Sequence, residues 1–181
     1  MSLPPELFSA VKDAEKIMVR TGIGTYYERC AEIMAALMGK GMNVILITFD
    51  VRVRELFDLL EKEKADVRAV CVIDCVSLLA GKGSAPIPKL INVYRPEYFV
   101  DIQIYTYLFL KKLKFANTFV FFLSMDKLEH YQSFDEVGMF LFVFDRFVRR
   151  HRVAQIVVEH DKIDFALRSI IANYADREIV I

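Results

Sequence analysis

The feature that most constrains the fold is an alternation along the chain of short apolar runs, each of strand length, with segments of helical periodicity. Residues 44–47 are Val-Ile-Leu-Ile, with no polar interruption, which is typical of a strand covered on both faces. Parallel strands joined by crossover helices produce this alternation. We therefore predict an α/β fold with three layers, in which an open, mostly parallel sheet carries helices on both faces.

The expected elements cover the chain from end to end. Strands are predicted at residues 16–20, 43–48, 69–73, 90–93, 118–123, 154–158 and 178–180. Helices are predicted at residues 4–14, 26–38, 52–63, 100–113, 134–150 and 162–174. The loop after the third strand contains Gly81, Gly83, Pro86 and Pro88, and its length of about 15 residues makes it the expected mobile segment.

Length and composition indicate one packed domain. The 181 residues suffice for a single core, so residues 1–181 are expected to form one domain. Hydrophobic residues make up 55% of the chain, which excludes a disordered or low-complexity protein. Lys plus Arg and Asp plus Glu are 24 each. No overall field therefore attracts nucleic acid or an anionic membrane, and neither is expected as a partner.

The sequence also argues against a membrane span and a metal centre. Mean hydropathy is +0.30, but no run approaches the roughly 20 uncharged apolar residues that a span needs. We expect a cytoplasmic protein. Its three cysteines are too few for a disulfide framework, and we expect reduced thiols. Paired Cys or His clusters for zinc are absent from the sequence, and we predict neither a resident metal nor a cofactor.

In an open α/β sheet, ligands bind beyond the carboxyl ends of the strands. The first candidate is the turn after the first strand, with Gly22 and Gly24, followed by Thr25 and Tyr26. Thr25 and Glu28 have the spacing of a capping box, which would occupy first-turn amides and add negative charge. Both effects oppose a phosphate. A dinucleotide loop would need glycine at Tyr27, although Gly22, Gly24 and Asp50 keep that alternative open.

Residues 16–50, 69–77 and 119–160 together resemble RecA-like domains of the KaiC-like kind, and more closely archaeal relatives that have lost the Walker A loop. In the active family, a Lys-Thr pair follows the first turn and a strand ending in Asp-Ser supplies the acid linked to magnesium. Here Leu123-Ser124 occupies the Asp-Ser position. The resemblance implies that one strand separates the first strand from the strand at that position.

Phosphoryl transfer depends on charge placed around the phosphates and the metal. Because this chain has no Walker A lysine and no acid beside Ser124, the resemblance implies an ATPase fold without ATP hydrolysis. Asp74 ends the third predicted strand. It is either a substitute magnesium ligand or, as we favour, a carboxylate with a structural role at a sheet edge or a helix cap.

Two further groups of polar residues could carry chemistry. Asp126, Glu129 and His130 have helical spacing and could hold a divalent ion, but they fall in a predicted loop, where solvation is the favoured interpretation. Residues 159–161, Glu-His-Asp, follow a strand, and His160 could act as a general base if a nucleophile faced it. The sequence identifies no such nucleophile, so we favour a structural role.

The helix at 134–150 is expected to bury one broad face against the sheet. Met139 and Phe142 project away from this face, among charged residues that include Arg146 and Arg149. This apolar pair is either a case of ordinary surface exposure or the centre of an interface with a charged rim. The basic run at 146–152 could contact nucleic acid, but its place at a helix C-terminus favours solvation and dipole complementation.

Two functions follow. The first is a non-catalytic interaction or regulatory module, a homo-oligomer or a partner of another protein, that uses Met139, Phe142, Arg146 and Arg149. The second is a binding site for a nucleotide, dinucleotide or adenosyl compound in the crevice at the strand ends. That crevice would be formed by Gly22, Gly24, Thr25, Tyr26, Asp50, Asp74 and Ser124.

Overall fold

The computed structural model describes residues 3–50, 52–77, 80–81, 87, 89–93, 99–113, 117–130 and 132–181. The predicted α/β architecture is confirmed. One seven-stranded sheet, parallel throughout, lies between two layers of helices. The loop expected to be mobile lies largely outside the described residues.

The strands follow the predicted ranges closely. They are β1 (Lys16–Thr21), β2 (Asn43–Thr48), β3 (Val70–Asp74), β4 (Leu90–Asn92), β5 (Thr118–Leu123), β6 (Ala154–His160) and β7 (Arg177–Val180). Their order across the sheet is β4-β3-β2-β5-β6-β1-β7. A single strand, β6, therefore separates β1 from β5, as the resemblance implied. Because all strands run the same way, their carboxyl ends meet along one edge of the sheet.

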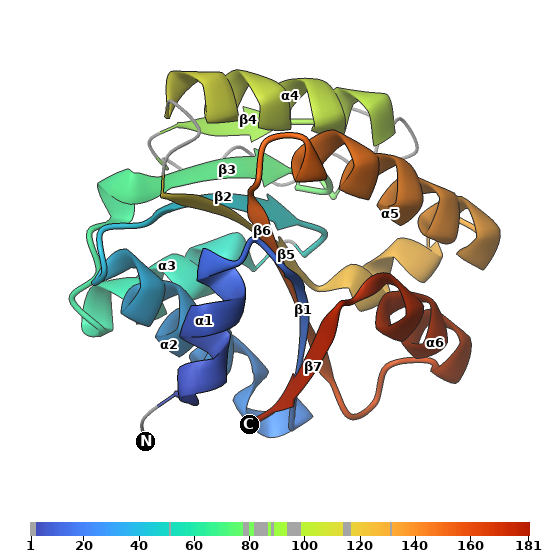
Figure 1. The fold of residues 1–181 in the computed structure, drawn as a ribbon, viewed down its shortest axis with the longest axis horizontal. Coiled ribbons are helices and arrows are strands. Elements are labelled where there is room, and N and C mark those ends of the chain that lie inside the picture. The colour runs from blue at the N-terminus through green and yellow to red at the C-terminus, as the bar shows by residue number, and fades with distance from the viewer. Residues whose placement is uncertain are drawn as a thin grey trace.

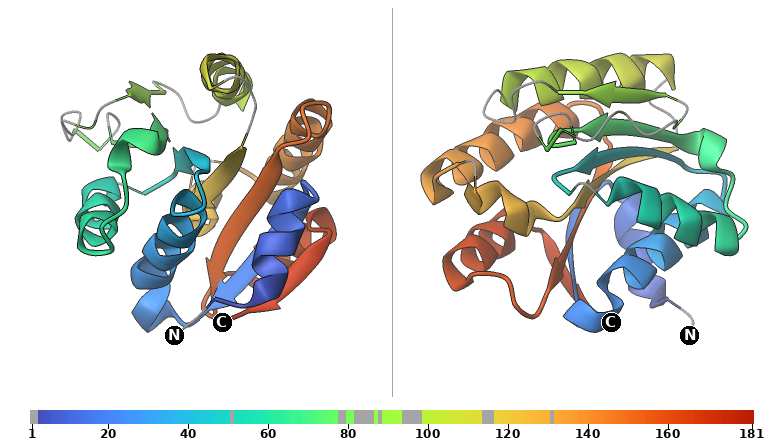
Figure 2. Two further views of the ribbon diagram at one scale, coloured as in Figure 1. Left: turned by 60° about the vertical axis from the view of Figure 1, so that its left-hand side comes forward. Right: turned by 180° about the vertical axis from the view of Figure 1, so that it is seen from behind.

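The helices form two groups on opposite faces of the sheet (Figures 1 and 2). One face carries α1 (Pro5–Lys12), α2 (Tyr26–Met38) and α3 (Val53–Lys62), and the other carries α4 (Phe99–Lys112), α5 (Phe134–Arg149) and α6 (Phe165–Tyr174). Alternate residues of each inner strand face the two layers, so Val44 and Leu46 pack with the first group and Ile45 and Ile47 with the second. Both faces of the sheet are thus covered.

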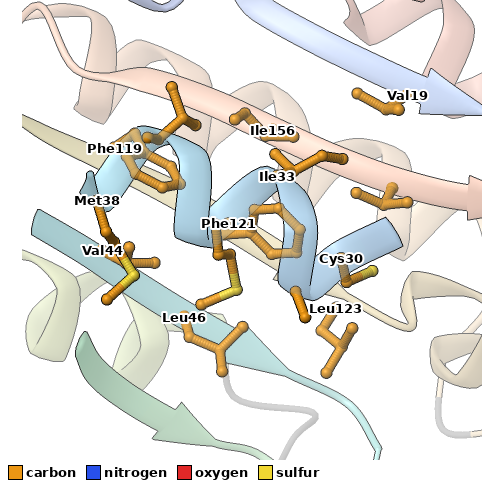
Figure 3. Packing of buried hydrophobic residues seen from close by; sticks show 14 of the residues in the cluster. Val19, Cys30, Ile33, Met38, Val44, Leu46, Phe119, Phe121, Leu123 and Ile156 are labelled. Carbon is orange, nitrogen blue, oxygen red and sulfur yellow. The ribbon is translucent and has the colours of Figure 1, made fainter. Parts of the chain in front are cut away.

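The first layer is centred on α2. Cys30 and Ile33 of this helix lie over Phe121 and Leu123 of β5 (Figure 3). All of these side chains are fully buried. Cys30, Cys71 and Cys75 are all buried free thiols.

Helix ends reveal two caps that the sequence analysis missed. Ser133 and Glu136 form a capping box at the start of α5, in which each side chain bonds the other residue's backbone N–H. The predicted helix at 162–174 begins only at Phe165, because the Asp164 side chain accepts hydrogen bonds from the amides of Ala166 and Leu167. In the described part of the chain, no helix has both the length and the apolar character needed to cross a membrane.

Candidate functional site

The carboxyl ends of β2, β5 and β6 and the first turn of α2 enclose a cavity of about 180 Å³. Its walls carry polar side chains from segments far apart in the sequence. The lining residues are Ile23, Tyr26, Tyr27, Asp50, Arg52, Ser124, Asp126, Lys127 and His160. The structure thus brings together three of the predicted crevice residues, Tyr26, Asp50 and Ser124.

Tyr26 ties strand ends together inside this cavity. Its hydroxyl donates to the carbonyl oxygen of Val158 at 3.2 Å and accepts from the backbone N–H of Ser124 at 2.7 Å. Ser124 has φ of 59°, a left-handed conformation that turns the chain sharply after β5. Burial raises the pKa of Tyr26 well above its usual value. Because the Tyr26 side chain is buried and already bonded, its role is structural, and it is not available to stack on a ligand.

Asp50 is held by three neighbours. Tyr27 donates its hydroxyl proton to Oδ2 at 2.5 Å, Ser124 donates at 3.4 Å, and Arg52 donates from its backbone and its guanidinium. Burial alone would raise the pKa of Asp50, but the hydrogen bonds from Arg52 and Tyr27 outweigh it, so the pKa lies below its usual range. Burial and the bond to Asp50 raise the pKa of Tyr27. The carboxylate is therefore fully engaged within the chain.

His160, at the end of β6, is also engaged. Its Nδ1 accepts from the backbone N–H of Lys162 at 3.2 Å, so the ring proton lies on Nε2, which is 3.5 Å from Oδ2 of Asp126. The same carboxylate oxygen lies 2.8 Å from Nζ of Lys127. This hydrogen bond from Lys127 to Asp126 raises the pKa of Lys127. Because the lone pair on Nδ1 already accepts from Lys162, His160 has no lone pair directed at a nucleophile.

The neighbours of His160 point elsewhere. Glu159 is buried on β6, with Oε1 at 3.2 Å from Nε of Arg20 and 3.4 Å from Nε of Arg168. Burial raises the pKa of Glu159, although both arginines oppose that shift. Asp161 accepts the backbone N–H of Ile23 at 2.9 Å. The three consecutive polar residues therefore serve three separate contacts and form no catalytic constellation.

The predicted capping box at Thr25 and Glu28 is wrong. Residues Ile23–Thr25 form a 3-10 turn, and Thr25 has φ of −125° and ψ of 14°. A helix N-cap needs an extended backbone, so the Thr25 hydroxyl instead reaches back to the carbonyl oxygen of Gly22 at 3.4 Å. The Thr25 side chain therefore does not cap the backbone amides in the first turn of α2, contrary to the prediction.

Asp74 lies apart from the crevice and lines neither the 180 Å³ cavity nor its larger neighbour. Its Oδ1 accepts from the amides of Val76 and Ser77, and the residue is buried at the end of β3. Oδ1 thus caps a turn at the end of β3, which is not an edge strand, whereas the buried Oδ2 has no hydrogen-bond partner among the described residues.

A larger cavity of about 430 Å³ adjoins the first and shares Ile23, Tyr26, Tyr27 and Arg52 with it. Gly24 lines it, whereas Gly22 and Thr25 line neither cavity. The cavity is also lined by three carboxylates and one lysine, from Glu28, Glu55, Asp58 and Lys62. This excess of acid disfavours a phosphate group.

Asp126 and His130 of the candidate metal triad lie in one short helical segment. Residues Met125–His130 form a 3-10 helix in place of the predicted loop. Asp126 is drawn towards His160 and Lys127, and the side chain of Glu129 lies outside the described part. Among the described residues, no group of three His, Cys, Asp or Glu side chains is placed to hold a metal ion.

Arg52 and Lys127 are charged crevice residues that the sequence analysis missed. Both lie directly beyond a strand end, close to an acidic residue that had been noticed, Asp50 or Asp126. This position, beyond a strand end and close to an acidic residue, was the sequence feature that could have identified them. Each cation is paired with that carboxylate, at 3.2 Å for Arg52 and 2.8 Å for Lys127.

The second candidate surface lies on α5. Met139 is 64% exposed and Phe142 59%, and the Arg146 guanidinium lies 5.9 Å from the centre of the Phe142 ring. Arg149 is engaged within the chain, at 3.3 Å from Asp145 and 3.8 Å from Asp176. The predicted buried face of α5 is confirmed: Val137, Phe140, Leu141, Phe144 and Val148 lie in the core, and Phe147, also expected there, is partly buried against it.

The sequence analysis missed the matching surface on α4. Ten large apolar side chains are exposed among the described residues, and seven of them belong to α4 and α5. These are Val100, Ile104, Tyr107 and Leu108 on α4 and Met139, Phe142 and Val143 on α5. The two helices are neighbours, since Phe99 stacks on Phe140 with ring centres 4.2 Å apart. We call these seven residues the α4/α5 face.

No protein-family model matches the chain, and no curated protein does.

Proposed function

We propose that this chain is a cytoplasmic, non-catalytic domain of the RecA-like, KaiC-like type that acts as a protein-interaction or regulatory module. Its contact surface is the α4/α5 face. The observation that carries this proposal is that seven of the ten large apolar side chains exposed in the described part of the chain lie on two neighbouring helices. Scattered apolar residues are normal on a protein surface, whereas a contiguous apolar patch marks a binding site.

The strand order supports the RecA-like part of the proposal. β6 lies between β1 and β5, which is the arrangement that the resemblance implies. The turn after β1 carries no lysine, and Ser124 follows Leu123 where the family has an acid. Arg52 and Lys127, the two cationic residues that line the 180 Å³ cavity, are each paired with a carboxylate. Little positive charge is thus left to stabilise a transferring phosphoryl group.

The interaction proposal is tested by exchanging one exposed aromatic residue at a time. Phe142→Asp places a charge within the α4/α5 face. Phe165→Asp is the matched control, because Phe165 is 80% exposed but lies on α6, outside that face. Doubly tagged chains are isolated from their native cells, and copies of the chain and other proteins are quantified. Associations lost with Phe142→Asp and retained with Phe165→Asp are expected, and complete insensitivity to Phe142→Asp contradicts the proposal.

The non-catalytic part is tested separately with purified protein, ATP and magnesium. We expect no turnover above that of a mock purification. Turnover that disappears in the Asp50→Asn variant would place a working acid in the crevice and overturn this part of the proposal.

Ligand binding in the crevice is the second candidate function. The observation in its favour is that the 180 Å³ and 430 Å³ cavities share the half-buried ring of Tyr27. The Arg52 guanidinium now covers this ring at 4.4 Å, and a flat ligand would take its place. Thermal unfolding with a nucleotide, a dinucleotide and an adenosyl compound tests this, since ligand at 100 times its Kd adds about 2.7 kcal/mol. No shift with any of them discards the idea.

A further inference from the structure

Two opposite charges on the exposed side of α5 have no ion-pair partner among the described residues. Asp135 lies in the first turn and Arg146 in the last turn, both exposed. Met139 and Phe142 lie between them on the same side of the helix. We call these four residues the α5 stripe. Of the other charged residues near this stripe, Glu136 caps the helix and Asp145 pairs with Lys16 and Arg149, whereas Arg150 is exposed and has no ion pair among the described residues.

The α5 stripe is symmetric about a point midway between residues 140 and 141. Met139 and Phe142 lie one and a half residues on either side of this point, and Asp135 and Arg146 lie five and a half residues away. At 1.5 Å per residue, the two charges are each about 8 Å from the midpoint along the helix axis. If two copies of α5 pair antiparallel about this midpoint, every Asp135 therefore faces an Arg146.

We propose that this chain forms a two-fold symmetric homodimer in which α5 packs antiparallel against α5 of a second copy. This proposal rests on the function proposed above and names the partner of the α4/α5 face. The apolar pair of each stripe packs against the same pair of the other copy, and two Asp135–Arg146 ion pairs close the ends. A self-complementary patch of this kind is what a two-fold interface requires.

The groove beside the stripe gives independent support. Gly138 and Phe142 line a hollow of about 300 Å³ between α5 and α6, which are neighbouring helices on this face of the sheet (Figure 1). In the antiparallel arrangement, Phe142 of the second copy comes to nearly the same height as Gly138, on the same side of the stripe. The ring of the second copy therefore enters this groove above the glycine.

This arrangement also explains why residue 138 is a glycine. A glycine inside a helix destabilises it relative to alanine. The fold itself does not demand the glycine, because an added Cβ would meet only Ile170 Cγ2, at an ordinary contact distance of 3.7 Å. A close approach by the second copy accounts for the missing side chain.

The exposed apolar residues of α4 enlarge the interface. The two-fold axis runs across the paired helices, so α4 of both copies lies on the same side of the α5 pair. Val100, Ile104 and Leu108 then add apolar area towards the roughly 1,000 Å² that a specific interface needs. We place α5, and not α4, at the centre of the interface. The exposed Lys111 and Lys112 of α4 have no exposed acidic residue on the same helix with which a second copy could form reciprocal ion pairs.

The test is a charge exchange, measured on the full chain by sedimentation over a concentration series reaching about 100 μM. Asp135→Arg and Arg146→Asp each place like charges opposite one another at both ends of the α5 pair. Each is expected to raise the dimer Kd by about tenfold. Asp135→Arg combined with Arg146→Asp restores opposite charges and is expected to return the Kd to within about threefold of the original.

Controls separate association from folding. Arg54→Asp reverses an exposed charge on α3, on the other face of the sheet, and Phe165→Asp alters an exposed aromatic residue on α6. Both are expected to leave the Kd unchanged. The thermal midpoint of each stripe variant is measured as a monomer at low concentration, so that a folding defect is distinguished from lost association.

Each result decides a different part of the proposal. A wild-type chain that stays monomeric throughout the series overturns the homodimer, yet the proposed interaction function stands if other proteins still depend on Phe142. A dimer that survives Phe142→Asp, or that the double exchange does not restore, overturns the antiparallel geometry. A dimer broken by Ile104→Asp alone, with Phe142→Asp silent, moves the interface to α4 and likewise contradicts this arrangement.

Discussion

The crevice at the strand ends and the α4/α5 face use the same kinds of side chain in opposite ways. In the crevice, Asp50 and Asp126 are each bonded to a cation in the same chain. On α5, Asp135 and Arg146 have no such ion pair among the described residues, and Phe142 lies open between them. The crevice is thus polar but internally satisfied, whereas the α5 surface is incomplete without a partner. Function is better sought where the chain leaves groups unpaired.

Removing the Asp50 carboxylate from the crevice is the strongest test of this contrast between the two regions. Asp50→Ala leaves Tyr27 and Arg52 without their acceptor, in a site where Asp50 is only 5% exposed. We expect a loss of about 2 kcal/mol of unfolding free energy, measured by urea denaturation. A loss below about 0.5 kcal/mol would mean that the Asp50 network contributes little to stability and is free for another purpose.

Lowering the pH should also weaken the Asp50 network. The expected loss of unfolding free energy is smaller than the loss that Asp50→Ala causes at neutral pH. The folded-state pKa of Asp50 is lowered, so its stabilising effect is complete above the unfolded value of about 3.9 and is lost as pH falls below it. The difference in unfolding free energy between wild type and Asp50→Asn is therefore largest near neutral pH and shrinks in acid. Urea denaturation from neutral pH to strong acid measures it, and a constant difference contradicts the assignment.

Gly138→Ala is expected to act in two directions. Alanine stabilises the isolated helix by about 0.5–1 kcal/mol, because the glycine loses more backbone freedom on folding. The same methyl group obstructs the groove that the second copy would enter, so association weakens while the monomer becomes more stable. Chemical denaturation and sedimentation of the same samples measure both effects. An equal gain in stability and association would argue against close approach at Gly138.

The smallest expected effect on stability comes from the exposed aromatic residues. Phe142→Ala and Phe165→Ala should each change the unfolding free energy of the monomer by no more than about 0.5 kcal/mol, because both rings are largely exposed. Only Phe142→Ala should weaken association. A large destabilisation by Phe142→Ala in the monomer would show that the ring supports the core, and the contrast between the two regions would fail.

The sequence by itself determined the succession of elements and the buried face of α5. Apolar periodicity reports burial directly, so the helix at 26–38 and the strands at 43–48 and 118–123 have the predicted bounds. It also singled out Met139 and Phe142 as exposed. Helical spacing predicted the inner face of α4, where Ile102 and Phe109 are buried. The exposed residues Val100, Ile104, Tyr107 and Leu108 escaped notice because that helix is apolar on nearly every side, so an apolar residue does not by itself mark an open face.

Only the tertiary structure decided which polar groups meet. Strand order brings His160 to Asp126 and Tyr27 to Asp50, pairs that no local spacing connects, and it leaves Asp74 outside the crevice. The 3-10 turn before α2 likewise removed the predicted cap at Thr25, since backbone conformation, not residue type alone, aims a capping side chain. Hydrophobic pattern is local and survives in the sequence, whereas charge pairing depends on chain segments that only folding brings together.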